Sequence, residues 1–354
     1  MSESVAGVQG GATFLVLPGQ ESRVRIILRR TVTVPAYFIA FAALVLVSPF
    51  LLLLGFVIDI PFRRRLATVR SFAMVDVFFF CEVAGTVASL WLWIRHRDRQ
   101  RFLDANFALE CWWASSLYRA GVWLFSLHLE VEGDEVTEHG PMMVFSRHVS
   151  PIDNLLPVAL ISDYRQIQLR WVINRSLLRD PCIDIVGNRL PNCFVANSSG
   201  DSEAEIRRVD ALGRNLGPRD GVLIFPEGGL FSPAKRERVI HRLESQDSPL
   251  TERARAMRNV LPPRLGGSMA LLAAARNVDA IFLAHTGLEG ATEYRNILRG
   301  GLVGRTIRVK LWRVPATEIP TTNESRISWL FDQWAAVDAW VEANKAQVST
   351  KNAR

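Results

Sequence analysis

A run of 28 residues without a charged side chain, from Thr31 to Ile58, constrains the fold of this chain more than any other feature. About 20 apolar residues are enough for a helix to cross the hydrocarbon core of a bilayer. Pro35 and Pro49 lie inside the run, and membrane helices tolerate the kinks that proline causes. The sequence therefore predicts a membrane helix here, and a buried helix of a soluble core is the less favoured alternative.

A second apolar stretch covers residues 71–94. It ends in Trp91 and Trp93, which suit the boundary between lipid and water. Asp76 and Glu82 interrupt its first half, and ionisable side chains are expensive inside a membrane. We therefore predict a second membrane segment that either spans the bilayer or re-enters on the same side.

Arginines flank both apolar stretches. Residues 31–100 are predicted to form a membrane-anchoring hairpin, preceded by a flexible basic N-terminus at residues 1–30. The distribution of arginine favours the cytosolic side for everything after the hairpin, at a bacterial inner membrane or the endoplasmic reticulum. The net charge of +7 suits anionic lipid headgroups, and no nucleic-acid-binding motif is present, so we expect no nucleic-acid partner.

Short apolar strands alternate with helices from residue 126 onwards, which predicts an α/β domain with a mixed sheet flanked by helices. We assign this domain to residues 101–320. A helix at 105–124 either lies on the membrane or packs on the sheet. Residues 321–354 are predicted to form a C-terminal amphipathic helix and tail. The expected strands are 126–132, 142–146, 167–173, 193–196, 221–225, 278–284 and 305–315, and the expected later helices are 151–162, 201–216, 251–259, 267–277 and 324–345.

The four cysteines show no paired spacing and no histidine partners. Disulfide frameworks and zinc sites both require such spacing. We therefore expect buried, reduced thiols and no metal site.

His148 follows the predicted strand 142–146 at a turn from strand to helix. Asp153 comes five residues later, and a carboxylate at that distance can hold an imidazole that acts as a base. Ser150, Pro151 and Asp153 are also typical of a helix start, where Asp153 would only cap the helix. Both roles are compatible, because a side chain in a first helical turn leans back toward the preceding loop.

A second predicted strand, 221–225, runs into the turn Phe225-Pro226-Glu227-Gly228-Gly229. Proline ends the strand ladder, and the glycines permit positive φ and a close approach of the backbone. An ordinary strand exit with an exposed glutamate is the alternative interpretation of this segment.

Together and in this order, the two segments resemble the glycerolipid acyltransferase family, which includes 1-acylglycerol-3-phosphate and lysophospholipid acyltransferases. Pro263-Arg264-Leu265-Gly266-Gly267 is similar to a segment of its lysocardiolipin acyltransferase branch. The resemblance implies a membrane-bound enzyme that transfers an acyl chain from acyl-CoA or acyl carrier protein to the hydroxyl of a lysophospholipid, such as lysophosphatidic acid. Membrane lipids and the acyl donor are then the expected partners, with no cofactor and no metal.

The resemblance also implies roles for individual residues. His148 would be the general base, and Asp153 would hold its ring and stabilise the imidazolium. Glu227 would either orient hydroxyls of the acceptor or brace the site. The residues expected to bind substrate are Arg147, Phe225, Pro226, Glu227, Gly228 and Arg264.

Three positions depart from the family pattern. Arg147 replaces an asparagine, Gly229-Leu230 replaces Thr-Arg, and Asn197 replaces an arginine that helps hold the acceptor's phosphate in the family. Either the acceptor is not a simple phosphate-bearing lipid, or another cation takes over, with Arg264 preferred to Arg189 and Arg147. A basic cluster beyond the glycines is either a solvated face or a further anion contact, and it comprises Lys235, Arg236, Arg238, His241 and Arg242.

Two alternative functions remain open. The departures above would also fit a catalytically degenerate, lipid-binding member of the family. A serine hydrolase using Ser268, with Asp279 and His285 in hydrolase order, is less favoured, because no strand precedes the serine.

Overall fold

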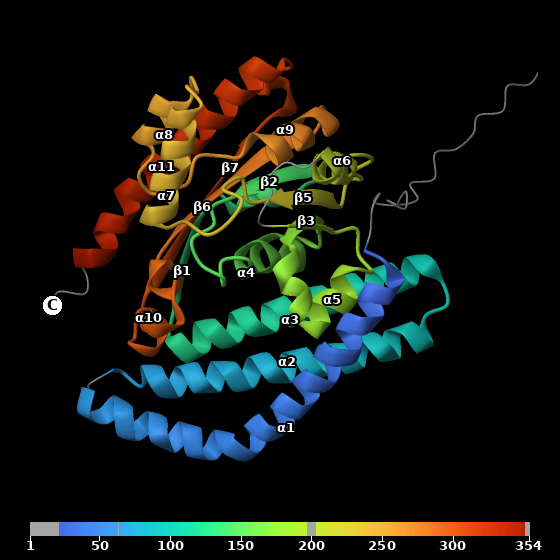
Figure 1. Cartoon of the computed structure of the whole chain (residues 1–354), viewed down its shortest axis with the longest axis vertical. Coiled ribbons are helices and arrows are strands. Elements are labelled where there is room, and N and C mark those ends of the chain that lie inside the picture. Colours follow the sequence, from blue (N-terminus) through green and yellow to red (C-terminus); the bar gives the residue numbers. More distant parts are fainter. Residues whose placement is uncertain (1–20, 63, 197–202, 351–354) are drawn as a thin grey trace, which may run out of the picture.

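The computed structural model describes residues 21–62, 64–196 and 203–350, and their side chains up to residue 345. Three long helices, α1 (Arg23–Phe62), α2 (Ala67–Arg95) and α3 (Arg99–Phe125), form a layer below an α/β domain (Figure 1). α1 and α2 are long and apolar enough to cross a membrane. Residues 1–20 of the predicted flexible N-terminus lie outside the described residues. From Arg23 onwards the chain is helical, so the prediction is wrong for that part.

The sheet has seven strands in the order β1-β7-β6-β2-β5-β3-β4. All neighbours are parallel except β6 and β7, so the predicted mixed α/β sheet is confirmed. All seven expected strands are present within one or two residues of their predicted ends. Their bounds are β1 (His128–Glu132), β2 (Met142–Ser146), β3 (Gln168–Asn174), β4 (Cys193–Val195), β5 (Asp220–Ile224), β6 (Asp279–Thr286) and β7 (Thr306–Val314).

Helices cover both faces of this sheet (Figure 1). Side chains that alternate along β2 divide between two cores: Met143 and Phe145 pack with α9 and α11, whereas Met142 and Val144 pack with α3 and α4. This alternation follows from the two-residue period of a strand. The helices are α4 (Leu155–Pro157), α5 (Pro181–Gly187), α6 (Glu203–Leu212), α7 (Pro233–Ser245), α8 (Thr251–Ala256), α9 (Leu265–Ala274), α10 (Tyr294–Leu298) and α11 (Asn323–Thr350). Short 3-10 turns occupy Asp134–Thr137, Arg175–Arg179, Glu289–Ala291 and Ala316–Glu318.

The helix expected at 151–162 is not regular. Residues 151–154 form a turn, and the short α4 is followed by a π-helical turn at Val158–Asp163. Pro157 has no amide hydrogen, so the bond that would reach back to the carbonyl of Asp153 cannot form. The hydrogen bonds that the side chain of Asp153 accepts from the amides of Val149 and Ser150 can therefore set the shape of this turn.

The C-terminal helix α11 runs from Asn323 to Thr350 in the segment where the sequence predicts a helix. Leu330, Trp334, Val337 and Val341 are all at most 1% exposed and lie on one face against the sheet. A fully buried side chain of this size stabilises the fold by about 1.5–3 kcal/mol. The indole of Trp334 also donates a 3.0 Å hydrogen bond to the carbonyl of Leu261. α11 therefore fixes the segment that leads to Arg264.

α3 joins the helical layer to the domain. Ala114 and Phe125 belong to the core beneath the sheet, so α3 packs on the domain, which was one of the two expected placements. Trp123 on the same helix is 78% exposed, so one edge of α3 remains open to the surroundings.

Candidate active site

The turn after β2 brings His148 and Asp153 together at the carboxyl ends of the central parallel strands. Nδ1 of His148 lies 2.7 Å from Oδ1 of Asp153. The other carboxylate oxygen accepts hydrogen bonds from the amides of Val149 and Ser150 at 2.6 and 2.8 Å. One buried carboxylate therefore orients the imidazole and shapes the turn at residues 151–154, where no regular helix begins for it to cap.

The ionisation of this pair follows from its surroundings. Burial raises the pKa of Asp153, but His148, His285 and the amide of Ser150 lower it by more, so the net pKa lies below the ordinary value. A carboxylate beside Nδ1 selects the imidazole tautomer with its proton on Nδ1. Nε2 of His148 is then the basic nitrogen, and it has no hydrogen-bond partner among the described residues. The ring stacks on Phe225 with 4.3 Å between centroids.

His285, on β6, lies behind this pair. Its Nε2 is 3.0 Å from the carbonyl oxygen of Arg147 and 3.6 Å from Oδ2 of Asp153. Burial lowers the pKa of His285, so the ring is neutral beside the carboxylate. In the sequence, His285 has a possible role only in the hydrolase alternative. Its position depends on β2 and β6 being neighbours, which no local pattern reveals.

Glu227 joins three segments of the site. Its carboxylate accepts hydrogen bonds from the amide of His148 at 2.8 Å and from the amide of Leu261 at 2.9 Å. Its side chain is almost completely buried, and burial raises the pKa of Glu227 to about 7 against the effect of these two bonds. Of the two roles expected for Glu227, bracing the site fits this geometry.

Arg147 does not face the site, and the expectation that it binds substrate is wrong. The residue is 2% exposed, and its guanidinium donates to the carbonyls of His285 and Asn259 and to the carboxylate of Glu289 at 2.6–3.1 Å. The side chain therefore serves to hold the neighbouring loops.

Arg189 is also committed elsewhere. It donates to the carbonyl of Ser89 and to Asn106, and its guanidinium lies over the ring of Phe102. It is therefore excluded as the substitute cation. Asn197 lies outside the described residues.

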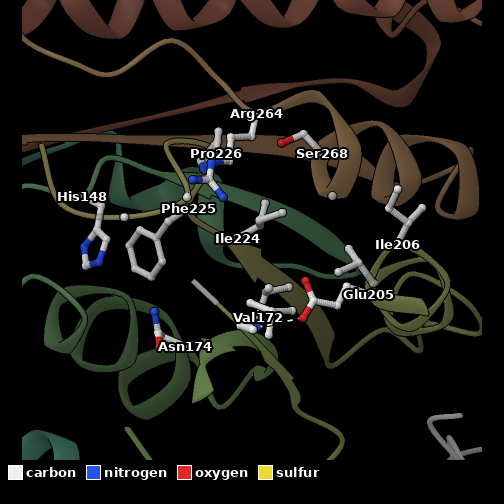
Figure 2. A pocket seen from close by; sticks show the side chains of 16 residues that line it. His148, Val172, Asn174, Glu205, Ile206, Ile224, Phe225, Pro226, Arg264 and Ser268 are labelled. Carbon is white, nitrogen blue, oxygen red and sulfur yellow. Dashed lines mark hydrogen bonds between the residues drawn. The ribbon is translucent and has the colours of Figure 1, made fainter. Parts of the chain in front are cut away.

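A pocket of about 140 Å³ opens beside the histidine (Figure 2). Arg264 extends into it above Phe225, and among the described residues its guanidinium has no acceptor. The predicted site residues that line the pocket are His148, Phe225, Pro226, Gly228 and Arg264. The apolar part of its wall consists of Val172, Val195, Ile206, Val209 and Ile224. The pocket thus has a basic nitrogen and a cation near His148, and a largely apolar wall elsewhere that also includes Asn174 and Glu205.

The hydrolase triad is not assembled. Ser268 lies in α9, while Asp279 is bound by Arg313 at 2.7 Å and by the amide of Ala316 at 2.8 Å. His285 is turned toward the carbonyl of Arg147. These three residues therefore cannot pass a proton among themselves, and the hydrolase alternative has no site.

The chain is similar to known acyltransferases. The Acyltransferase family model matches residues 128–280, the segment that carries His148, Asp153, Glu227 and Arg264. Among solved structures, the 1-acyl-sn-glycerophosphate (LPA) acyltransferase PlsC from Thermotoga maritima is similar, with a TM-score of 0.49 and 16% identity. That match covers 83% of this chain and 99% of the other. No curated protein matches the chain. The segment at residues 128–280 is thus similar to the acyltransferase family, the family that the sequence resembles.

Proposed function

We propose that the chain is a membrane-bound O-acyltransferase that moves an acyl chain from acyl-CoA or acyl carrier protein to the hydroxyl of a lysophospholipid. The observation that carries this proposal is the orientation of His148. Asp153 holds Nδ1 of His148 at 2.7 Å. Nε2 of the same ring has no hydrogen-bond partner among the described residues, and His148 lines the pocket. An imidazole held by a carboxylate beside a pocket is suited to general base catalysis.

The reaction needs no nucleophile from the protein. Nε2 of His148 takes the proton of the lipid hydroxyl as its oxygen attacks the thioester carbonyl carbon. The tetrahedral intermediate then collapses, the carbon–sulfur bond breaks, and the imidazolium returns the proton to the departing thiolate. Asp153 stabilises the imidazolium between these two steps without itself being protonated.

The developing oxyanion requires a hydrogen-bond donor near the pocket. The amide of Gly228 already donates to the carbonyl of Phe225 at 3.0 Å. The amide of Gly229 has no acceptor among the described residues, and this glycine lines the pocket. Gly229 is thus the better candidate of the two donors in this turn.

Arg264 is the cation that we assign to a phosphate group of the substrate. Its amide donates to the carbonyl of Pro226 at 2.8 Å, which fixes the start of the side chain. The side chain then crosses Gly228 where a Cβ would collide with it, so only glycine leaves room for this path. Arg264 therefore enters the pocket in one defined direction, next to His148.

We further propose that α1 and α2 lie in one leaflet. Arg29 and Arg30 at the start of α1 bind Asp184 of α5 at 2.7 and 3.0 Å. At the far end of the hairpin, Arg70 donates to the carbonyl of Leu124 and to Ser126. Both ends thus contact the catalytic side, and the helices lie below the domain (Figure 1). A spanning hairpin would place its loop about 30 Å away, across the hydrocarbon core.

Most of the hairpin surface is apolar and exposed, as a leaflet-embedded layer requires. In the apolar part of α1, only 6% of residues are buried within the protein. Leu46 and Phe50 on α1 and Trp91 and Trp93 on α2 are all more than half exposed. Exposed apolar surface of this extent is typical of a membrane contact.

Cysteine labelling in sealed vesicles tests this topology. We expect Ser22→Cys, Arg65→Cys and Arg242→Cys to react with a membrane-impermeant maleimide in vesicles that expose the cytosolic face, and not in vesicles of the opposite orientation. Cys81, Cys111, Cys182 and Cys193 are buried and should contribute little background. Reaction of Arg65→Cys from the opposite face would establish a spanning hairpin.

The enzymatic proposal is tested with purified protein, labelled acyl-CoA and acyl carrier protein, and a panel of lysophospholipids. We expect acyl transfer to 1-acylglycerol 3-phosphate and no covalent labelling by a fluorophosphonate probe, because the mechanism has no serine nucleophile. Labelling that disappears in Ser268→Ala would favour the hydrolase. No transfer to any acceptor from either donor would leave the degenerate, lipid-binding alternative.

A further inference from the structure

Two consecutive glycines in the turn after β5 make room for two cations. A Cβ at Gly228, which has a φ of +62°, would collide with the side chain of Arg264. A Cβ at Gly229, with a φ of +149°, would collide with Nζ of Lys235. The Arg264 side chain therefore takes a path that glycine leaves open, and the flexible end of Lys235 lies against Gly229. Gly229 and Arg264 both line the pocket.

The carboxylate of Glu227 acts on Lys235 through its charge but forms no ion pair with it. Among the described residues, neither the Arg264 guanidinium nor the Lys235 ammonium has a hydrogen-bond acceptor or an ion-pair partner. The nearby Glu227 directs its two oxygens at the amides of His148 and Leu261 instead. Two like charges held close together, with no ion-pair partner among the described residues, are stabilised when an anion binds.

Lys235 also stands at an unfavourable place in its helix. It is in the first turn of α7, where its amide donates to the capping hydroxyl of Ser232 at 3.2 Å. The start of a helix carries a partial positive charge and favours anions. Burial lowers the pKa of Lys235, and the charge of Arg264 lowers it further. Each of these effects is relieved by a negatively charged ligand.

The start of α9 supplies further unused donors. α9 begins at Leu265 with no side-chain cap, and the amides of Gly266 and Gly267 have no acceptor among the described residues. The hydroxyl of Ser268 is buried, lines the pocket and lacks any hydrogen-bond partner. In Figure 2 this hydroxyl points toward Arg264. A buried hydroxyl without a partner destabilises a fold, so its presence here indicates a ligand.

We propose that Lys235, Arg264, Ser268 and the free amides of α9 together form a cradle for a phosphoryl group of the substrate. Two cations, a hydroxyl and helix-end amides match the charge and the oxygen acceptors of a phosphate. This inference rests on the proposed function. The phosphoryl group belongs either to the lipid acceptor or to the phosphates of coenzyme A, and the experiment separates these sources.

Steady-state kinetics of Lys235→Gln and Ser268→Ala provide the first test, with Lys310→Gln as a matched control. Lys310 of β7 pairs with Glu132 of β1, at the edge of the sheet that lies opposite to β3 and β4. We expect Lys235→Gln to raise KM for 1-acylglycerol 3-phosphate by about 10- to 100-fold and Ser268→Ala to raise it by about 2- to 10-fold. Turnover of the neutral monoacylglycerol with the same chain should not change.

The two sources of the phosphoryl group give different results. A rise in KM for the lipid assigns the cradle to the acceptor, and a rise in KM for acyl-CoA assigns it to the donor. Unchanged values for both substrates would overturn the proposal. An equal rise in KM in Lys310→Gln would also overturn it, because the rise would then follow from the loss of one positive charge anywhere on the protein.

Ligand binding tests the cradle without relying on turnover. We expect glycerol 3-phosphate or coenzyme A to raise the thermal midpoint of detergent-solubilised His148→Ala, and this rise to disappear when Lys235→Gln and Ser268→Ala are added. If wild-type protein shows no transfer but this pattern holds, the proposed function fails and the cradle stands. If transfer occurs but the ligand shift survives both substitutions, the cradle fails alone.

Ser268→Ala also separates a binding role from a structural one. The hydroxyl has no partner within the described residues, so its removal should leave the thermal midpoint of the unliganded protein unchanged or raise it. A clear fall in that midpoint would show that the hydroxyl supports the fold, and would remove Ser268 from the cradle.

Discussion

Replacement of His148 by alanine is expected to lower kcat/KM for acyl transfer by about 10³-fold or more, since positioned general bases typically contribute about 10²- to 10⁴-fold. The side chain has one hydrogen bond, to Asp153, and stacks on Phe225 at the edge of the pocket. The carboxylate keeps its two bonds to the amides of Val149 and Ser150 when the ring is removed. The loop should therefore retain its shape while the proton acceptor is lost.

Two further variants make this result interpretable. His148→Gln keeps an amide donor for Asp153 but cannot accept the hydroxyl proton, so it should be as inactive as alanine and closer to wild type in stability. His139→Ala removes an exposed histidine outside the site and should have no effect. General base catalysis predicts a loss of about 10²-fold or more in His148→Ala. If this variant kept an activity within about tenfold of wild type, His148 would not be the base.

The sequence predicts the sheet well because its strands are short apolar runs between turn residues. Met142 to Ser146 is fully buried, as its composition indicates. The charged helix α7 was not predicted, because its one buried apolar position, Ile240, shows no periodicity. Its start was readable, since Ser232 caps the helix and Pro233 occupies its first turn. The many charged residues of α7 leave no apolar periodicity that would predict a helix, although its capping residues indicate where it begins.

The site is less predictable, because it depends on the order of the strands. His148 and Asp153 are close in sequence, so their pairing could be expected. His285 reaches the same carboxylate only because β6 is a neighbour of β2. Arg147 is adjacent to His148 in sequence and still turns away from the pocket. Lys235 was one of five clustered cations, and only the bare Cα of Gly229 distinguishes it from the others.

The sharpest test of the catalytic pair is Asp153→Asn, for which we expect a loss of about 10⁴-fold in kcat, the size seen when an amide replaces the orienting carboxylate of a triad. The amides of Val149 and Ser150 need an acceptor, so the single oxygen of asparagine should turn toward them. Its NH₂ group then faces Nδ1 of His148. Nδ1 must become an acceptor, the proton moves to Nε2, and the nitrogen that faces the lipid hydroxyl is no longer a base.

The thermal midpoint decides between this explanation and simple capping. Asp153→Asn keeps the acceptor for the loop amides and should remain folded, whereas Asp153→Ala loses that acceptor as well and should unfold at a clearly lower temperature. Leaving two buried amides unpaired costs about 1–3 kcal/mol each. If Asp153→Asn instead unfolds like alanine while its folded fraction transfers acyl chains at nearly the normal rate, the aspartate only caps the loop. His148 would then act without an orienting acid.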